Sequence, residues 1–187
     1  MKLNEFIKKY DMRVIDSSDK MIIDMPYCTK NNFTKEVLYD NDVCLLRAST
    51  AEKLIKANNS LLEKGLRIKV WDAFRPLSVQ YKMWDIFPDS RFVADPKTDK
   101  SNHCKGTAVD VTLCDIYGNE LNMPTEFDHF GEESYRDYYE KLDYKTKENV
   151  TLLENVMIQY GFKPFVYEWW HFNDTDEYDV IKENFEL

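Results

Sequence analysis

Histidine is scarce in this sequence, and the placement of its few histidines is the first indication of chemistry. Two of the three occur in short stretches that also hold a carboxylate. His103 precedes Asp110 in "SNHCKGTAVD", and Glu168 precedes His171 in "EWWH". Hydrolytic zinc sites use three protein ligands and leave one position for water, and imidazole and carboxylate groups suit this ion. The sequence therefore offers His103, Asp110 and His171 as one such set.

The segment around Asp110 predicts a strand, because residues 107–113, "TAVDVTL", alternate and are rich in β-branched side chains. A carboxylate in so apolar a strand is costly unless it is paired or bound to a metal. His103 lies seven residues earlier, an odd separation that a straight strand would place on the opposite face. We therefore expect Gly106 to bend the chain and bring both side chains to one ion.

Glu168 and His171 are three residues apart, so a regular strand would also point them to opposite faces. We expect a bulge or tight turn around Trp169 and Trp170, a feature common beside active sites. The two tryptophans would bury large surfaces and hold the pair rigid.

A histidine beside a strand is more often an ordinary core or surface residue than a ligand, and spacing alone leaves this alternative open. Cys104 directly follows His103, and neighbouring residues rarely both reach one tetrahedral ion, so we interpret it as a packing residue. His129 has no partner pattern and is expected in a solvated loop.

Helix and strand signals alternate along the chain. A capping box of Ser49 and Glu52 predicts a helix that ends by Gly65, and Thr146 is the expected cap of a last helix that ends at Gly161. Further predicted elements are a strand at 66–72, a helix at 77–87 and a strand-like stretch at 162–172. The stretch at about 124–145 is loop-like, with room for a short helix. This order predicts an α+β fold in which residues 1–187 form a single domain. We expect a central, mainly antiparallel sheet flanked by helices, with the zinc site at the sheet.

The composition is that of a soluble globular protein, with 43% hydrophobic and 32% charged residues among 187. No apolar run approaches the roughly 20 residues of a membrane helix, and the charged N-terminus lacks a signal peptide, so we expect a cytoplasmic protein. A net charge of −9 disfavours nucleic-acid binding. The four cysteines form no Cys-x-x-Cys pair and are expected to be reduced.

The chain resembles the VanX-type D-alanyl-D-alanine dipeptidases of the zinc DD-peptidase superfamily. The signature of that superfamily is Ser-x-His-x-x-Gly-x-Ala-x-Asp followed by Glu-x-x-His. All of its positions are filled here, by Ser101, His103, Gly106, Ala108, Asp110, Glu168 and His171. "WDAFRP" (71–76), "MPTEFDHFGE" (123–132) and "YCTKNNF" (27–33) resemble further family segments, with Phe74 in place of the usual tyrosine. The resemblance covers about residues 20–175, and the tail after Glu177 has no counterpart in it.

The resemblance implies an α+β zinc peptidase with one zinc ion per chain, which cleaves the dipeptide D-Ala-D-Ala. It implies Glu168 as the catalytic base and Arg75 as a stabiliser of the transition state. The implied zinc ligands are His103, Asp110 and His171, and the implied substrate contacts are Ser101 and Asp128 at the amino end, with Tyr27 lining the pocket. Asp72 is expected to brace Arg75 or a zinc-binding imidazole.

Two alternatives remain open within the same superfamily. One is a DD-carboxypeptidase that trims D-Ala from peptidoglycan stem peptides, and the other is a non-catalytic zinc-bound module. The expected lack of a signal peptide and the "FDHF" segment favour the dipeptidase. Glu168 and Arg75 argue against the non-catalytic module, since a purely structural zinc needs neither. The sequence leaves open the oligomeric state, the physiological role and the identity of the native metal, for which cobalt and nickel are alternatives.

Overall fold

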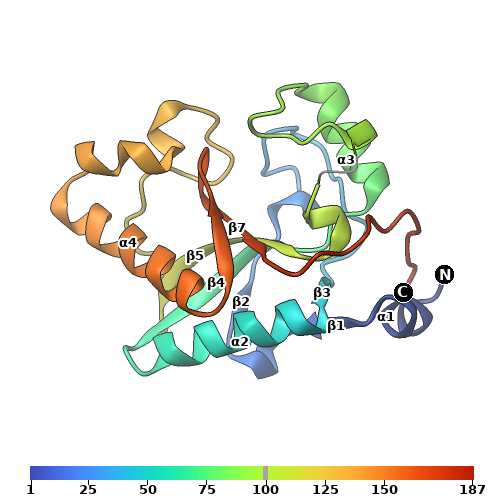
Figure 1. The fold of residues 1–187 in the computed structure, drawn as a ribbon, viewed down its shortest axis with the longest axis horizontal. Helices are drawn as coiled ribbons and strands as arrows, with labels where there is room; N and C mark the ends of the chain where they lie inside the picture. The colour runs from blue at the N-terminus through green and yellow to red at the C-terminus, as the bar shows by residue number, and fades with distance from the viewer. Residues whose placement is uncertain (99–100) are drawn as a thin grey trace.

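A five-stranded sheet lies at the centre of the molecule (Figure 1), in a computed structural model that describes residues 1–98 and 101–187. The strand order is β2-β4-β5-β7-β6. Within this sheet the pair β2–β4 is parallel, and the other neighbours are antiparallel. Its strands are β2 (Ile22–Ile23), β4 (Leu66–Asp72), β5 (Ala108–Asp115), β6 (Phe162–Phe165) and β7 (Glu168–Asp174). The predicted α+β fold with a mainly antiparallel sheet is thus confirmed.

Helices cover both sides of this sheet. α2 (Ala48–Leu62) and α4 (Tyr144–Gln159) pack against each other and against one side, whereas α3 (Leu77–Ile86) lies on the other side (Figure 1). A separate two-stranded sheet joins β1 (Met12–Ile15) to β3 (Cys44–Arg47), next to α1 (Leu3–Tyr10). Short 3-10 turns complete the chain at η1 (Ser17–Asp19), η2 (Pro26–Cys28), η3 (Pro96–Thr98), η4 (His103–Lys105), η5 (Glu132–Ser134) and η6 (Arg136–Lys141). Among the described residues, no helix has the length and hydropathy to span a lipid bilayer.

The helix ends differ from two sequence predictions. The capping box at Ser49 is wrong: α2 begins at Ala48 without a side-chain cap, and the Ser49 hydroxyl shares a hydrogen bond with the Tyr178 hydroxyl instead. The predicted cap Thr146 is also wrong, because Asp143 accepts from two backbone N–H groups at the start of α4. A carboxylate outcompetes a threonine hydroxyl as acceptor at a helix N-terminus, where the helix dipole favours negative charge.

The aromatic stretch at 162–172 forms two strands of a hairpin, with a turn at Val166 and Tyr167. Its pairing is irregular: Pro164 lies opposite Phe172, but the next residue, Phe165, lies opposite Glu168. The residues between Glu168 and Phe172 on β7 therefore bulge out of the β6–β7 ladder. This confirms the predicted bulge around the two tryptophans, both of which are fully buried.

The C-terminal tail packs against the segment that directly follows His103. Ile181 is buried, and its N–H donates to the carbonyl of Cys104 at 2.9 Å. Phe185 packs against Phe6 and Phe74, so the two termini meet at one end of the molecule (Figure 1). Cys104 itself is buried, as expected for a packing residue, and the cysteines form no disulfide among the described residues.

Candidate active site

Three neighbouring strands place a row of functional side chains across the sheet. Asp110 on β5 lies opposite His171 on β7, and on its other side it lies opposite Asp72 on β4. His103 reaches the same place from η4, because Gly106 adopts a left-handed conformation (φ +75°) between η4 and β5. The bend predicted at Gly106 is therefore present.

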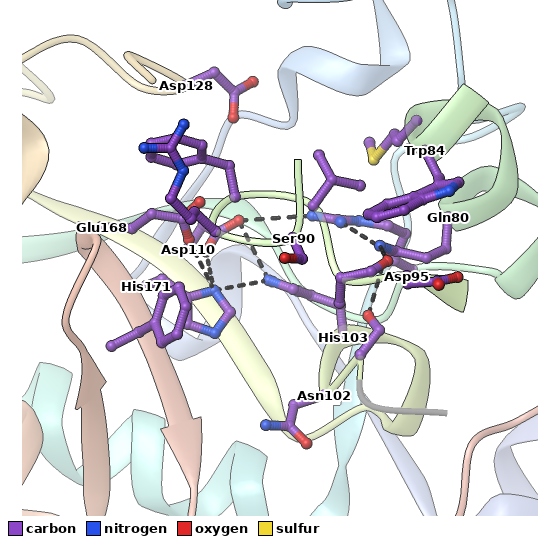
Figure 2. A pocket seen from close by; sticks show the side chains of 18 of the residues that line it. Gln80, Trp84, Ser90, Asp95, Asn102, His103, Asp110, Asp128, Glu168 and His171 are labelled. Carbon is purple, nitrogen blue, oxygen red and sulfur yellow. Dashed lines mark hydrogen bonds and ion pairs between the residues drawn. The ribbon is translucent and has the colours of Figure 1, made fainter. Parts of the chain in front are cut away.

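The predicted metal ligands converge (Figure 2). His171 Nδ1 lies 2.9 Å from Asp110 Oδ1, and His103 Nε2 lies 3.3 Å from Asp110 Oδ2. The two ring nitrogens are 3.2 Å apart. One ligand atom from each residue lies within 4.8 Å of the other two, and the cluster lines a cavity of about 610 Å³. These three residues have the donor types and spacing for a divalent transition metal.

The outer nitrogens of both rings support this fit. His103 Nδ1 lies 2.7 Å from the carbonyl oxygen of Ala73, and His171 Nε2 lies 2.9 Å from Asn173 Oδ1. A carbonyl or amide oxygen only accepts, so each of these nitrogens carries the proton and donates it. The inner nitrogens, His103 Nε2 and His171 Nδ1, then each present a lone pair. These lone pairs face each other and the Asp110 carboxylate. A divalent cation between these groups would relieve their mutual repulsion.

Asn173 was not predicted from the sequence. Its Oδ1 also accepts from Asn102 Nδ2 at 2.8 Å, which fixes the orientation of the amide toward His171. Asn173 lies two residues after His171 on β7 and so shares its face of the sheet. Strand periodicity was therefore a signal that could have found it. Burial is the main cause that lowers the pKa of His171, against an opposing effect of Asp110, and a lowered pKa favours the neutral ring that a metal ligand requires.

Glu168 lies beside the cluster, with its Oε2 3.7 Å from His171 Nδ1. Its side chain is buried and lines the same cavity. Burial, together with the charges of Asp110 and Asp128, raises the pKa of Glu168 well above its usual value. A carboxyl group with a raised proton affinity is suited to accept and return a proton.

Arg75 is buried next to the cluster, with Nη2 3.9 Å from Asp110 Oδ2. Its Nε and Nη2 both donate to Asp72 Oδ2, at 3.0 and 2.6 Å, so Asp72 braces the guanidinium as predicted. Tyr39 donates to the other Asp72 oxygen at 2.6 Å. Gln80, another residue that the sequence did not reveal, accepts from Arg75 Nη1 at 2.9 Å. The guanidinium is thus held from two directions.

The predicted substrate contacts line the same cavity. The Tyr27 hydroxyl lies 3.0 Å from each carboxylate oxygen of Asp128, and the Ser101 hydroxyl donates to Gln80 Oε1 at 3.2 Å. Asp128 has a left-handed backbone (φ +59°), a conformation that costs energy and often marks functional positions. Burial, and next the charge of Asp110, raises the pKa of Asp128 to about 8.

One further residue of the site was missed because it comes from a stretch predicted to be loop. Arg136 donates to the backbone carbonyls of the β7 bulge, where Glu168 and His171 lie. By contrast, His129 is exposed and its ring hydrogen-bonds to Glu133 four residues later, as expected for a solvated loop.

Comparisons with known proteins agree with this geometry. The family model described as Peptidase_M15, D-ala-D-ala dipeptidase, matches residues 8–186. The chain belongs to this family. It is 33% identical over 165 residues to a D-alanyl-D-alanine dipeptidase of Escherichia coli (strain K12), which covers 87% of this chain and 84% of that protein. It is also 27% identical over 174 residues to a D-alanyl-D-alanine dipeptidase of Enterococcus faecium, covering 82% of this chain and 86% of that protein.

Membership of the family makes this protein a peptidase. The matched region is longer than the resemblance found in the sequence, which ended near residue 175, and it takes in the C-terminal tail. The contact between Ile181 and Cys104 gives a physical reason, since the tail packs beside the turn that carries His103. The tail is thus part of the matched domain.

Proposed function

We propose that this protein hydrolyses the dipeptide D-Ala-D-Ala to two D-alanines, with one zinc ion held by His103, Asp110 and His171. The observation that carries the proposal is the pair of imidazole lone pairs that face the Asp110 carboxylate, beside Glu168 and Arg75. The names of the relatives in E. coli and Enterococcus faecium agree with this substrate.

The charges of the site support a substrate with a free ammonium group. Four carboxylates, those of Asp72, Asp110, Asp128 and Glu168, surround one guanidinium, that of Arg75. If all were ionised, the group would carry a net charge of −3 that burial makes costly. A divalent metal and the ammonium of a dipeptide would together balance it. Burial, and next the charge of Asp110, raises the pKa of Asp128, and bound cations would offset the contribution of Asp110.

The residues then have distinct tasks in peptide hydrolysis. Zinc, when bound, acts as a Lewis acid and makes water a stronger acid. Glu168 would take a proton from the attacking water and give it to the leaving amine, so that one carboxyl group serves first as base and then as acid. Arg75, held beside Asp110, would donate to the carbonyl oxygen as negative charge develops there.

Asp128 would receive the substrate ammonium, with Tyr27 holding its carboxylate in place and Ser101 on the cavity wall nearby. A free dipeptide carries this ammonium next to its scissile bond, whereas a longer peptide does not. An acidic group close to the metal cluster therefore favours the dipeptide over a stem peptide.

The cytoplasmic location expected from the sequence stays a prediction.

The test is to incubate the zinc-loaded protein with D-Ala-D-Ala and, separately, with a pentapeptide that ends in D-Ala-D-Ala, each with and without a chelator. We expect D-alanine only from the free dipeptide and only without chelator. Trimming of the pentapeptide would favour the carboxypeptidase instead. No turnover of either by protein that still binds zinc would indicate the non-catalytic module.

A variant separates binding from chemistry. Glu168→Gln should retain zinc and lose turnover, because the amide cannot accept the proton of the water. Glu183→Gln is the matched control. Glu183 forms an exposed ion pair with Lys9, so this variant should remain active. Full activity of Glu168→Gln would show that the base is another group.

A further inference from the structure

The cavity extends well beyond the catalytic cluster, and large apolar side chains form much of its far wall. Polar groups of the cluster occupy one part of the lining, and Figure 2 shows Trp84 across the cavity from Glu168 and His171. Apolar side chains on this part of the lining include Phe33, Met83, Trp84, Phe92 and Phe130. We call these five residues the aromatic wall.

Three members of the aromatic wall, Phe33, Phe92 and Phe130, pack ring against ring. The ring of Phe130 lies 5.0 Å from that of Phe33 and 4.9 Å from that of Phe92, measured between centroids. Phe87, behind the wall, stacks on Phe130 at 4.8 Å and so supports it. The wall residues come from α3 and from three separate loops, so the fold itself assembles this surface.

The size of the cavity exceeds the needs of a dipeptide with two methyl side chains. Its volume is about 610 Å³. Cavities of roughly 300–1,000 Å³ are typical of sites that enclose drug-sized ligands. Phe33, Trp84, Phe92 and Phe130 are only partly buried, which leaves aromatic surface facing the cavity. Apolar surface gains free energy when an apolar group displaces water from it.

We propose that the preferred substrates are dipeptides in which one residue carries a bulky apolar side chain, aromatic or long aliphatic, and that the aromatic wall binds this side chain. The inference rests on the proposed function, since it concerns the same site. The polar cluster would act on the peptide bond and hold the charged end, while the wall distinguishes one side chain from another. Each methylene group held in such a pocket changes the specificity constant by roughly 10–200-fold.

The experiment compares kcat/KM of the zinc-loaded full chain for D-Ala-D-Ala, D-Ala-D-Phe and D-Phe-D-Ala. Both isomers are included because either residue can present the bulky group. We expect at least one of them to exceed D-Ala-D-Ala by roughly tenfold or more. If neither exceeds D-Ala-D-Ala, the inference is overturned while the proposed function stands. If none of the three is cleaved, both fail.

Two variants locate the preference. Ser90 also lines the cavity (Figure 2), and Ser90→Trp should fill part of its space, lowering kcat/KM for the bulky substrate more than for D-Ala-D-Ala. Trp84→Ala should lower kcat/KM for the bulky substrate by about tenfold, chiefly by raising KM. Tyr117→Ala, which removes an exposed aromatic ring outside the cavity, is the matched control. Equal losses for bulky and small substrates in both cavity variants would refute a role of the wall in specificity.

Discussion

Replacing Arg136 with methionine should weaken metal binding without touching any proposed ligand. The Arg136 guanidinium lies behind the β7 bulge, and its Nη2 donates to three carbonyl groups of that backbone. The acceptors of Nη2 are the carbonyl oxygens of Glu168, Trp169 and His171, at 3.2, 3.0 and 3.0 Å. Carbonyl groups in the bulge do not pair with β6. The guanidinium therefore supplies the hydrogen-bond donors that a neighbouring strand would otherwise provide. Arg136 is thus a positioning residue for Glu168 and His171.

The size of the effect follows from the other partners of this guanidinium. Arg136 also donates to the carbonyl of Phe165 and forms an ion pair with Glu154. Removing one partner of a buried ion pair costs about 3–5 kcal/mol of unfolding free energy. The Glu154 side chain is 27% exposed and can regain water, so the low end, about 3 kcal/mol, applies. Loss of a residue that orients a metal ligand typically lowers metal affinity by about 10–100-fold, and we expect a change of that size here.

Urea unfolding of the metal-free protein measures stability, and competition with a chromophoric chelator measures zinc affinity. Lys145→Met, which breaks an exposed ion pair with Glu148, is the control and should change stability by less than about 1 kcal/mol. The double variant Arg136→Met, Glu154→Leu removes the stranded carboxylate, so it should regain stability but not zinc affinity. Wild-type zinc affinity in Arg136→Met would refute the positioning role, whatever the loss of stability.

Other parts of the site give further expectations. Asn173→Ala should weaken zinc binding by about tenfold in the same competition assay, because the His171 ring loses the acceptor that orients it. Chelation of bound zinc should lower the unfolding free energy by about 4 kcal/mol at a zinc concentration 1,000 times its Kd, as seen by urea unfolding. Gly106→Ala should cost about 1–2 kcal/mol in the same unfolding assay, since φ is +75° there and an added Cβ would approach Met12 Cε to 2.8 Å. The pKa of Asp128 is about 8 in the folded protein, whereas an unfolded aspartate has its ordinary pKa of 3.8. Folding therefore takes up a proton between these values, and the stability of the metal-free protein should fall as pH rises through this range, but less so in Asp128→Asn.

The ligand set was accessible from sequence because its members conflict with their surroundings. Asp110 interrupts an apolar strand, and the spacings of His103 and His171 break strand periodicity. Each conflict with the local pattern indicates that the residue is there for function. The roles of Arg136 and Gln80 left no such trace. Arg136 binds backbone carbonyls, which every sequence contains, and Gln80 reaches the site from a helix of ordinary pattern. The missed cap of α4 has a similar origin, since Asp143 and Thr146 are both polar residues that could accept from the same N–H groups.

A bulge in β4 explains how the sheet brings Asp72 into this site. Val70 lies opposite Val111, and in a regular ladder Trp71 would then lie opposite Asp110. Instead, Asp72 takes that position, so that Trp71 is the extra residue on β4. A slip of one residue moves every following side chain to the other face. Without this bulge, Asp72 would point away from Arg75, and the guanidinium would lose its brace. The bulges in β4 and β7 thus act in the same way: each changes the side of the sheet to which the following residues point, and together they set the Arg75 brace and the Glu168–His171 pair on the face that carries Asp110.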